Sequence, residues 1–438
     1  MSFIPIVIFP ALFILVFLGI PVAFSLIIIS VSFGYLILGD LIFLQLYGPI
    51  LSTSSNFILA AIPLFIFMGT ILERTGIALR LFQALQLWVG RWPGGVAIAT
   101  ILMCAVFAAA SGVVGAVEIV VGLMAIPAMQ KYKYDGSLIA GTICAGGSLG
   151  TIIPPSIVVV VYASMAQLSI GQLFAATMLP GLLMVVFFVG YILLRAYLKP
   201  QDAPPISKED NDIPLKTKLL ITVKALLPPL ILIFAVLGSL LVGAASPTEA
   251  AAVGAVGALL LAAAFKELKW KTLKSALAVT VRITSMIMLI VVGGTMFTSV
   301  FALSGGGQMV RDFVVSAEFG EVGLILFLLA IVFIAGFVLD WISIVLIFIP
   351  IFIPIINAAG INQIWFTVMV MVVIQTSYLT PPMAPSIFYL RSIAPPNLTY
   401  KHMYRGVIPF VMIQLLVLIV VAFIPGVATY LPTLLVGL

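Results

Sequence analysis

Two proline pairs stand inside long apolar stretches, each beside glycine or hydroxyl-bearing residues. The first occurs in Gly146–Ser156 (GGSLGTIIPPS) and the second in Ser377–Ser386 (SYLTPPMAPS). Consecutive prolines remove two amide donors and disfavour α conformation in the preceding residue, so a helix must break at each pair. A break leaves carbonyl oxygens that suit Na⁺ and a helix N-terminus that suits an anion. Ser156 and Ser386 are therefore candidate substrate ligands; the alternative is a proline kink without a ligand.

The composition indicates that these breaks lie inside a membrane. Of 438 residues, 63% are hydrophobic and only 8% are charged, whereas soluble domains carry about 25% charged residues. The mean hydropathy is +1.34. These values exclude a soluble enzyme, a disordered chain and a disulfide-framed domain, and they indicate a polytopic membrane protein. The apolar runs are long enough for helices, so we predict an all-α fold.

Three more residues in apolar stretches could do chemistry. Ser111 opens the run Ser111–Gly115 (SGVVG), where a hydroxyl lies beside glycines, and it is a further candidate substrate ligand. Glu118 and Asp340 are single acids in apolar runs, and an acid inside a membrane is a functional candidate because its burial is costly. Both are possible coupling acids. The alternatives are close packing of small residues at 111–115 and helix capping by Asp340.

The pattern of apolar segments predicts two halves of similar design. Residues 1–199 form the first half, with a re-entrant hairpin at about 94–129 and a broken helix at about 137–166. Residues 200–218 are polar and form a cytoplasmic linker. Residues 219–438 form the second half, with a hairpin at about 322–357 and a broken helix at about 364–395. We expect 3–37 to be one long tilted helix, bent near Gly19, and not a signal peptide, because no basic stretch precedes it.

Lysines and arginines predict opposite orientations for the two halves. Both ends of the segment 94–129 carry basic residues, which favours a cytoplasmic entry. No basic residue closely flanks 322–357, which favours entry from outside. Gly69-Thr70 precedes the first proline pair at nearly the spacing by which Gly294-Thr295 precedes the second. Opposite directions with recurring landmarks indicate an inverted-topology repeat, the alternative being coincidence.

Several function classes find little support in the chain. There is one histidine, and the sequence contains no P-loop, nucleophile elbow or metalloprotease motif, so an enzyme is disfavoured. The basic balance of +6 is explained by cytoplasmic loops and does not indicate nucleic acid. A channel remains an alternative, and it would not move a solute against its gradient.

Over nearly its whole length the chain resembles the large membrane subunit (DctM-like) of tripartite ATP-independent periplasmic (TRAP) transporters. The resemblance is carried by GIPVAF at 19–24, IPLFIFMG at 62–69, Gly150–Ser156, PTEAA at 247–251 and LTPP at 379–382. It implies an elevator-type importer of small organic acids that is coupled to Na⁺. It also implies a location in the bacterial or archaeal inner membrane, a small four-helix membrane subunit and a periplasmic substrate-binding protein as partners.

The resemblance also implies two Na⁺ sites, built mostly from backbone carbonyls. One would use Ser111, Gly150, Ile153 and Pro155, and the other Gly336, Ser377, Thr380 and Met383. The chain departs from the family pattern at Val113-Val114, where many members have a second small hydroxyl residue, and at Ser377, where glycine is common. We therefore expect Na⁺-coupled import of a carboxylate delivered by a binding protein. The alternative is a stand-alone Na⁺- or H⁺-coupled anion symporter or exchanger.

Overall fold

The computed structural model describes residues 3–112, 115–207, 213–316 and 319–436, without the side chains of Ser111, Ala116, Val315 and Val436. Within these ranges the secondary structure is helical and contains no strand. Seven helices of the described chain are long and apolar enough to cross a membrane, at Phe57–Arg74, Ile170–Leu198, Leu215–Leu241, Pro247–Ala264, Trp270–Leu303, Trp341–Ala358 and Tyr400–Phe423. The prediction of an all-α polytopic membrane fold is confirmed.

The elements follow one another without large irregular stretches. The first half contains α1 (Ile4–Phe17), α2 (Val22–Leu38), α3 (Leu41–Ser54), η1 (Phe57–Ala60), α4 (Ala61–Arg74), α5 (Ile77–Val89), α6 (Gly95–Ser111), α7 (Ala116–Lys131), α8 (Gly136–Ser148), η2 (Leu149–Thr151), α9 (Ile157–Ala166), α10 (Ile170–Leu198) and η3 (Pro200–Asp202). The second contains α11 (Leu215–Leu241), α12 (Pro247–Ala264), α13 (Trp270–Leu303), α14 (Gly306–Ser316), α15 (Glu321–Ala335), α16 (Trp341–Ala358), α17 (Gln363–Leu379), α18 (Pro385–Ile393), α19 (Tyr400–Phe423) and α20 (Gly426–Val436).

Two helical hairpins and two interrupted helices lie where the sequence predicts them. Helices α6 and α7 pack together as one hairpin, and α15 and α16 form the other. Helix α8 stops at Ser148 and continues only as the short η2 before α9 starts at Ile157, while α17 stops at Leu379 and α18 starts at Pro385. The proline pairs occupy these two gaps, and both Pro-Pro peptide bonds are cis.

The N-terminal region differs from the expectation. The single helix expected over 3–37 is wrong: α1 and α2 are separate and pack against each other. Gly19 has a φ of +86°, in the left-handed region that glycine tolerates, and Pro21 precedes the first residue of α2. The chain therefore turns instead of bending. Helix α3, which no expected segment covers, follows after Gly39.

Each hairpin is preceded by an amphipathic helix that the apolar-segment pattern did not reveal. Helix α5 buries Ile77, Leu81 and Phe82 and exposes Leu79 and Trp88. Helix α14 stands in the matching position before α15, so each half runs from a long helix through an amphipathic helix, a hairpin and an interrupted helix to another long helix. This order supports a common design for the two halves.

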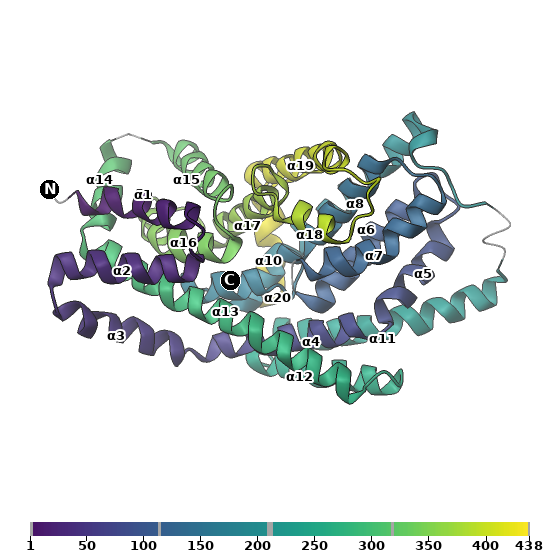
Figure 1. Ribbon diagram of the computed structural model, residues 1–438, viewed down its shortest axis with the longest axis horizontal. Helices are drawn as coiled ribbons and strands as arrows, with labels where there is room; N and C mark the ends of the chain where they lie inside the picture. The colour runs from purple at the N-terminus through teal and green to yellow at the C-terminus, as the bar shows by residue number, and fades with distance from the viewer. Residues whose placement is uncertain (1–2, 113–114, 208–212, 317–318, 437–438) are drawn as a thin grey trace.

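The helices are arranged around α13, the longest of them. It packs against α2, α3, α4 and α16, and in Figure 1 it runs with α4, α11 and α12 along one side of the molecule, with α2 and α3 at one end. The hairpins and interrupted helices gather on the other side. We call α6–α9 and α15–α18 the hairpin unit, and α2, α4 and α11–α13 the frame.

Candidate substrate and ion site

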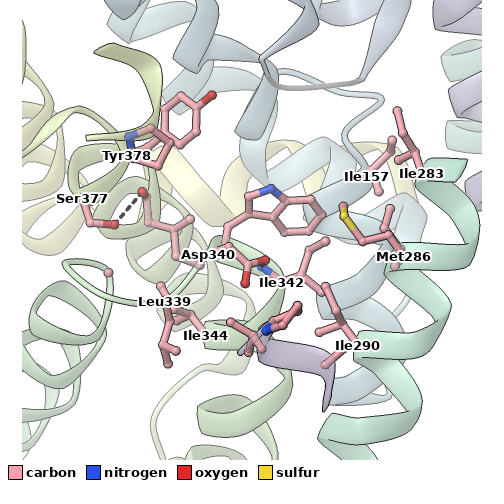
Figure 2. Close-up of a pocket in the computed structure, with 18 of the residues that line it drawn as sticks. Ile157, Ile283, Met286, Ile290, Leu339, Asp340, Ile342, Ile344, Ser377 and Tyr378 are labelled. Carbon is pink, nitrogen blue, oxygen red and sulfur yellow. Dashed lines mark hydrogen bonds between the residues drawn. The ribbon is translucent and has the colours of Figure 1, made fainter. Parts of the chain in front are cut away.

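A cavity of about 450 Å³ lies where the hairpin unit meets the frame. The turns of both hairpins reach it through Gly112, Gly336 and Asp340. Both interrupted helices also reach it, and α13 and the start of α2 form the opposite wall. Figure 2 shows side chains from these separate elements converging on this one space. Six helix ends from the hairpins and interrupted helices therefore meet at one cavity, and no single segment of sequence contains it.

The first interruption presents carbonyl oxygens that have no donor. Residues 149–156 are buried. The Leu149 carbonyl accepts hydrogen bonds from the N–H groups of Ile152 and Ile153, at 3.1 and 2.9 Å. In the described part of the chain, no donor bonds to the carbonyls of Gly150, Ile153 or Pro155. Unwound carbonyls of this kind coordinate Na⁺ in transporters with broken helices, so the donor set fits this ion.

The second interruption has the same character but is more open. Ser377 is buried, whereas Pro381, Pro382 and Met383 are exposed, and Met383 shows 45% of its surface. Among the described residues, no donor bonds to the carbonyls of Gly336, Thr380 or Met383. The Ser377 carbonyl accepts from the Thr380 N–H at 3.1 Å. The Thr380 hydroxyl donates to the Thr376 carbonyl at 2.7 Å, which leaves its lone pairs available to a cation.

Glycines bring each hairpin tip close to an interruption. Gly112 has a φ of +60°, and a Cβ built on it would lie 2.8 Å from the Pro155 carbonyl oxygen. A Cβ on Gly336 would collide with the Ser377 side chain. Gly336 and Ser377 both belong to the second predicted ion site, and Gly112 follows Ser111, which belongs to the first site together with Pro155. The structure therefore brings the two halves of both predicted ligand sets together, although the sets themselves remain predictions.

The predicted substrate serines are placed differently. Ser156 is fully buried and donates to the Thr151 carbonyl at 2.8 Å. Ser386 is fully buried as well, and neither side chain lines the cavity. The side chain of Ser111 and residues Val113 and Val114 lie outside the described residues; the backbone of Ser111 ends α6. A substrate role for these three serines stays a prediction.

The two acids have different surroundings. Both carboxylate oxygens of Asp340 are used at the start of α16, where they accept from the Ile342 N–H at 3.1 Å and from the Ser343 hydroxyl. Asp340 therefore caps α16 at the cavity wall. Glu118 is fully buried outside the cavity: its Oε1 accepts from the Ser386 hydroxyl at 3.2 Å, whereas its Oε2 has no partner in the described structure. Glu118 links the first hairpin to α18 of the second half.

A buried polar cluster beside this contact was not found by sequence reasoning. The Ser148 hydroxyl accepts from the amide groups of Gln375 and Gln414, at 3.0 and 3.2 Å. These residues come from α8, α17 and α19, so the cluster joins the two halves. Single glutamines in apolar runs at 375 and 414 were its only signal in the sequence, and such residues gain meaning only when their partners are known.

Two hairpins and two interrupted helices with free carbonyls meet at one cavity, and this arrangement is typical of a membrane transporter. The family model for the DctM component of the tripartite ATP-independent periplasmic transporter matches residues 9–427. The chain belongs to this family. It is thus the large membrane component of a TRAP system, and the expected resemblance is confirmed.

Curated relatives agree with this assignment, and a solved structure shares the fold. The chain is 33% identical over 381 residues to the C4-dicarboxylate TRAP transporter large permease protein DctM of Pseudomonas aeruginosa, covering 87% of each chain. It is 29% identical over 429 residues to the sialic acid permease SiaM of Vibrio cholerae, covering 97% of each. The YdaH transporter of Alcanivorax borkumensis has the same fold, with a TM-score of 0.64 at 14% identity, over 95% of this chain and 98% of that one.

Proposed function

We propose that the chain imports a small organic acid by a Na⁺-coupled elevator mechanism. The observation that carries the proposal is the meeting of two hairpin tips and two helix interruptions at one cavity between the hairpin unit and the frame. Free carbonyls at each interruption provide cation ligands, and the helix N-termini at Ile157 and Trp341 attract an anion. Na⁺ would supply positive charge beside the substrate, so that ion and substrate bind together.

The position of the cavity supports an elevator. Its walls belong to two groups of helices, so movement of the hairpin unit along α13 would carry the site across the membrane. The relatives' names include C4-dicarboxylate, sialic acid and ectoine permeases. By family, we expect the binding protein to deliver the substrate and a small membrane subunit to support the frame.

The first test needs no knowledge of the substrate. The melting temperature of the purified chain in detergent should rise with NaCl and not with KCl at equal ionic strength, because a ligand that binds the folded state stabilises it. The second test is uptake of a carboxylate into proteoliposomes holding the chain and its small subunit, with the binding protein outside. Uptake should require inward Na⁺. Uptake that persists when K⁺ replaces Na⁺ would disprove the coupling and direct attention to Glu118 as a proton carrier.

The role of the binding protein separates the proposal from a stand-alone symporter. Omitting the binding protein should abolish uptake at low substrate concentration if delivery is obligatory. Uptake that is equal with and without it would favour the stand-alone alternative while leaving Na⁺ coupling intact.

A further inference from the structure

The wall of the hairpin-tip cavity is mostly hydrocarbon. Helix α13 contributes Ile283, Met286, Ile287 and Ile290, which recur at the spacing of one helix face. Opposite them stand Ile157, Leu339, Trp341, Ile342, Ile344 and Ile374 from the hairpin unit. Figure 2 shows Met286 and Ile290 of α13 across the space from Asp340 and Ile342. A ligand held here must present apolar surface to most of this wall.

The charges around the cavity are sparse. Among the described residues that line it there is no lysine, arginine or histidine, and Asp340 is the one carboxylate. Both oxygens of Asp340 already accept hydrogen bonds in the α16 cap. Na⁺ in the two predicted sites can balance a substrate carboxylate at the hairpin tips. A second carboxylate directed at the α13 wall would meet aliphatic side chains without a counter-charge, and burying an unpaired charge costs several kcal/mol, on the order seen for buried ions.

Another cavity of the chain has a larger share of polar lining residues. A second cavity, of about 490 Å³, lies between α3, α9 and α13 and is lined by hydroxyl and amide groups. There the Asn56 amide donates to the Ser164 hydroxyl at 2.9 Å, and the hydroxyls of Thr53 and Thr295 lie 3.3 Å apart. The hairpin-tip cavity has polar side chains at Asp340, Ser377, Tyr378 and Tyr389 of the hairpin unit, whereas its α13 wall is apolar.

From this lining we infer that the substrate is an apolar monocarboxylate, with an aromatic or branched hydrocarbon body, and not a C4-dicarboxylate. The carboxylate lies at the hairpin tips beside Na⁺, and the body lies against Met286, Ile290 and Trp341. This inference rests on the proposed function. It differs from the substrate named for the Pseudomonas aeruginosa relative, and it makes the α13 face the determinant of specificity.

The binding test uses the purified full chain in NaCl, with benzoate, 3-methylbutyrate and succinate as probes and benzamide as the uncharged control. Binding is read from tryptophan fluorescence, and Trp341→Phe identifies the part of the signal that comes from the cavity. We expect benzoate and 3-methylbutyrate to bind at least about tenfold more tightly than succinate, a difference of about 1.4 kcal/mol. Benzamide should bind weakly, because it lacks the charge that Na⁺ balances.

A charge added to the wall gives a second, independent readout. Met286→Arg supplies the missing counter-charge, so it should strengthen succinate binding and weaken benzoate binding. Ser285→Arg adds the same charge one residue away, at an exposed position that does not line the cavity, and should leave the preference unchanged. The melting temperature of each variant shows that it is folded.

The outcomes separate the inference from the proposed function. Succinate binding as tight as benzoate binding, or an unchanged preference in Met286→Arg, overturns the apolar monocarboxylate while Na⁺-coupled transport stands. Stabilisation by Na⁺ with no binding of any carboxylate overturns the inference as well. If neither Na⁺ nor any carboxylate binds to the folded chain, the proposed function fails together with it.

Discussion

Thr380 and Gly336 show how single residues adjust the second predicted ion site. Thr380 ends α17 with its hydroxyl bonded back to Thr376, and Gly336 ends α15 against Ser377. Both positions combine a free carbonyl with a small or compact side chain. An ion of the size of Na⁺ requires such close backbone approach. A larger side chain at either position should therefore lower the affinity for Na⁺.

Thr380→Ala should raise the half-saturating Na⁺ concentration about fivefold, because one oxygen ligand worth about 1 kcal/mol is removed. The measurement is uptake, or thermal stabilisation, against Na⁺ concentration. Thr367→Ala is the matched control: it lies on the same helix, and its hydroxyl donates to the Gln363 carbonyl, away from the interruption. An unchanged Na⁺ dependence in Thr380→Ala would limit this residue to its backbone carbonyl.

Gly336→Ala should abolish Na⁺ stabilisation, because the new methyl group collides with Ser377 and forces the hairpin tip away from α17. The double variant Gly336→Ala/Ser377→Gly removes the obstacle and should recover most of the Na⁺ response. Gly307→Ala, where the added Cβ meets no neighbour within 4 Å, is the control for a glycine substitution. Failure of the double variant to recover would show that glycine is needed for a reason other than this collision.

At the scale of helices, the hairpin and interruption geometry depends on caps as well as on breakers. Asp340 starts α16 and Asp135 starts α8, where its carboxylate accepts from the N–H groups of Ser137 and Leu138 at 3.0 and 3.1 Å. A cap of this kind satisfies N–H groups that the first turn of a helix leaves unpaired. For Asp340, such a cap fixes where the second hairpin turns.

Substitutions at Asp340 distinguish a cap from a coupling acid. Asp340→Asn should keep stability and Na⁺-driven uptake, because an asparagine side chain also caps, whereas Asp340→Ala should lose about 1 kcal/mol of stability. Thermal unfolding and uptake are measured on both variants. Loss of uptake in Asp340→Asn with an unchanged melting temperature would contradict the capping role and assign the carboxylate to ion coupling.

At the scale of the whole molecule, the proposed mechanism depends on movement between the hairpin unit and the frame. Gly294 of α13 faces Leu346 of α16 across this boundary, and a Cβ on Gly294 would lie 2.6 Å from the Leu346 Cβ. Within the frame, a Cβ on Gly293 would lie 3.2 Å from the Leu26 Cβ on α2. In an elevator the Gly294–Leu346 contact would move and the Gly293–Leu26 contact would stay fixed, so the two pairs can be compared directly.

Oxidation of Gly294→Cys/Leu346→Cys should stop uptake, and reduction should restore it, because the disulfide ties the hairpin unit to the frame. Disulfides favour Cβ separations of about 3.8 Å, so the helices must part by about 1 Å. The pair Gly293→Cys/Leu26→Cys links two frame helices and should leave uptake largely intact. The native thiols, Cys104 and Cys144, are buried. Full uptake through the oxidised first pair would exclude an elevator that moves across this boundary.

The sequence by itself determined the membrane location, the helical class, the two hairpins and the two interruptions. These follow from local causes: few charges, long apolar runs, and proline pairs that no continuous helix accommodates. It did not reveal the turn between α1 and α2, helix α3 or the amphipathic helices α5 and α14. In these segments glycine, polar residues and partial exposure weaken the apolar pattern.

Only the tertiary structure placed Gly112 against Pro155, Gly336 against Ser377 and Glu118 against Ser386. It also showed that the side chains of Ser156 and Ser386 do not line the cavity and that α13 lies across from the hairpin tips. These are contacts between residues far apart in the chain. They depend on how helices pack side by side, and neither the spacing nor the type of a residue within its own segment specifies that packing.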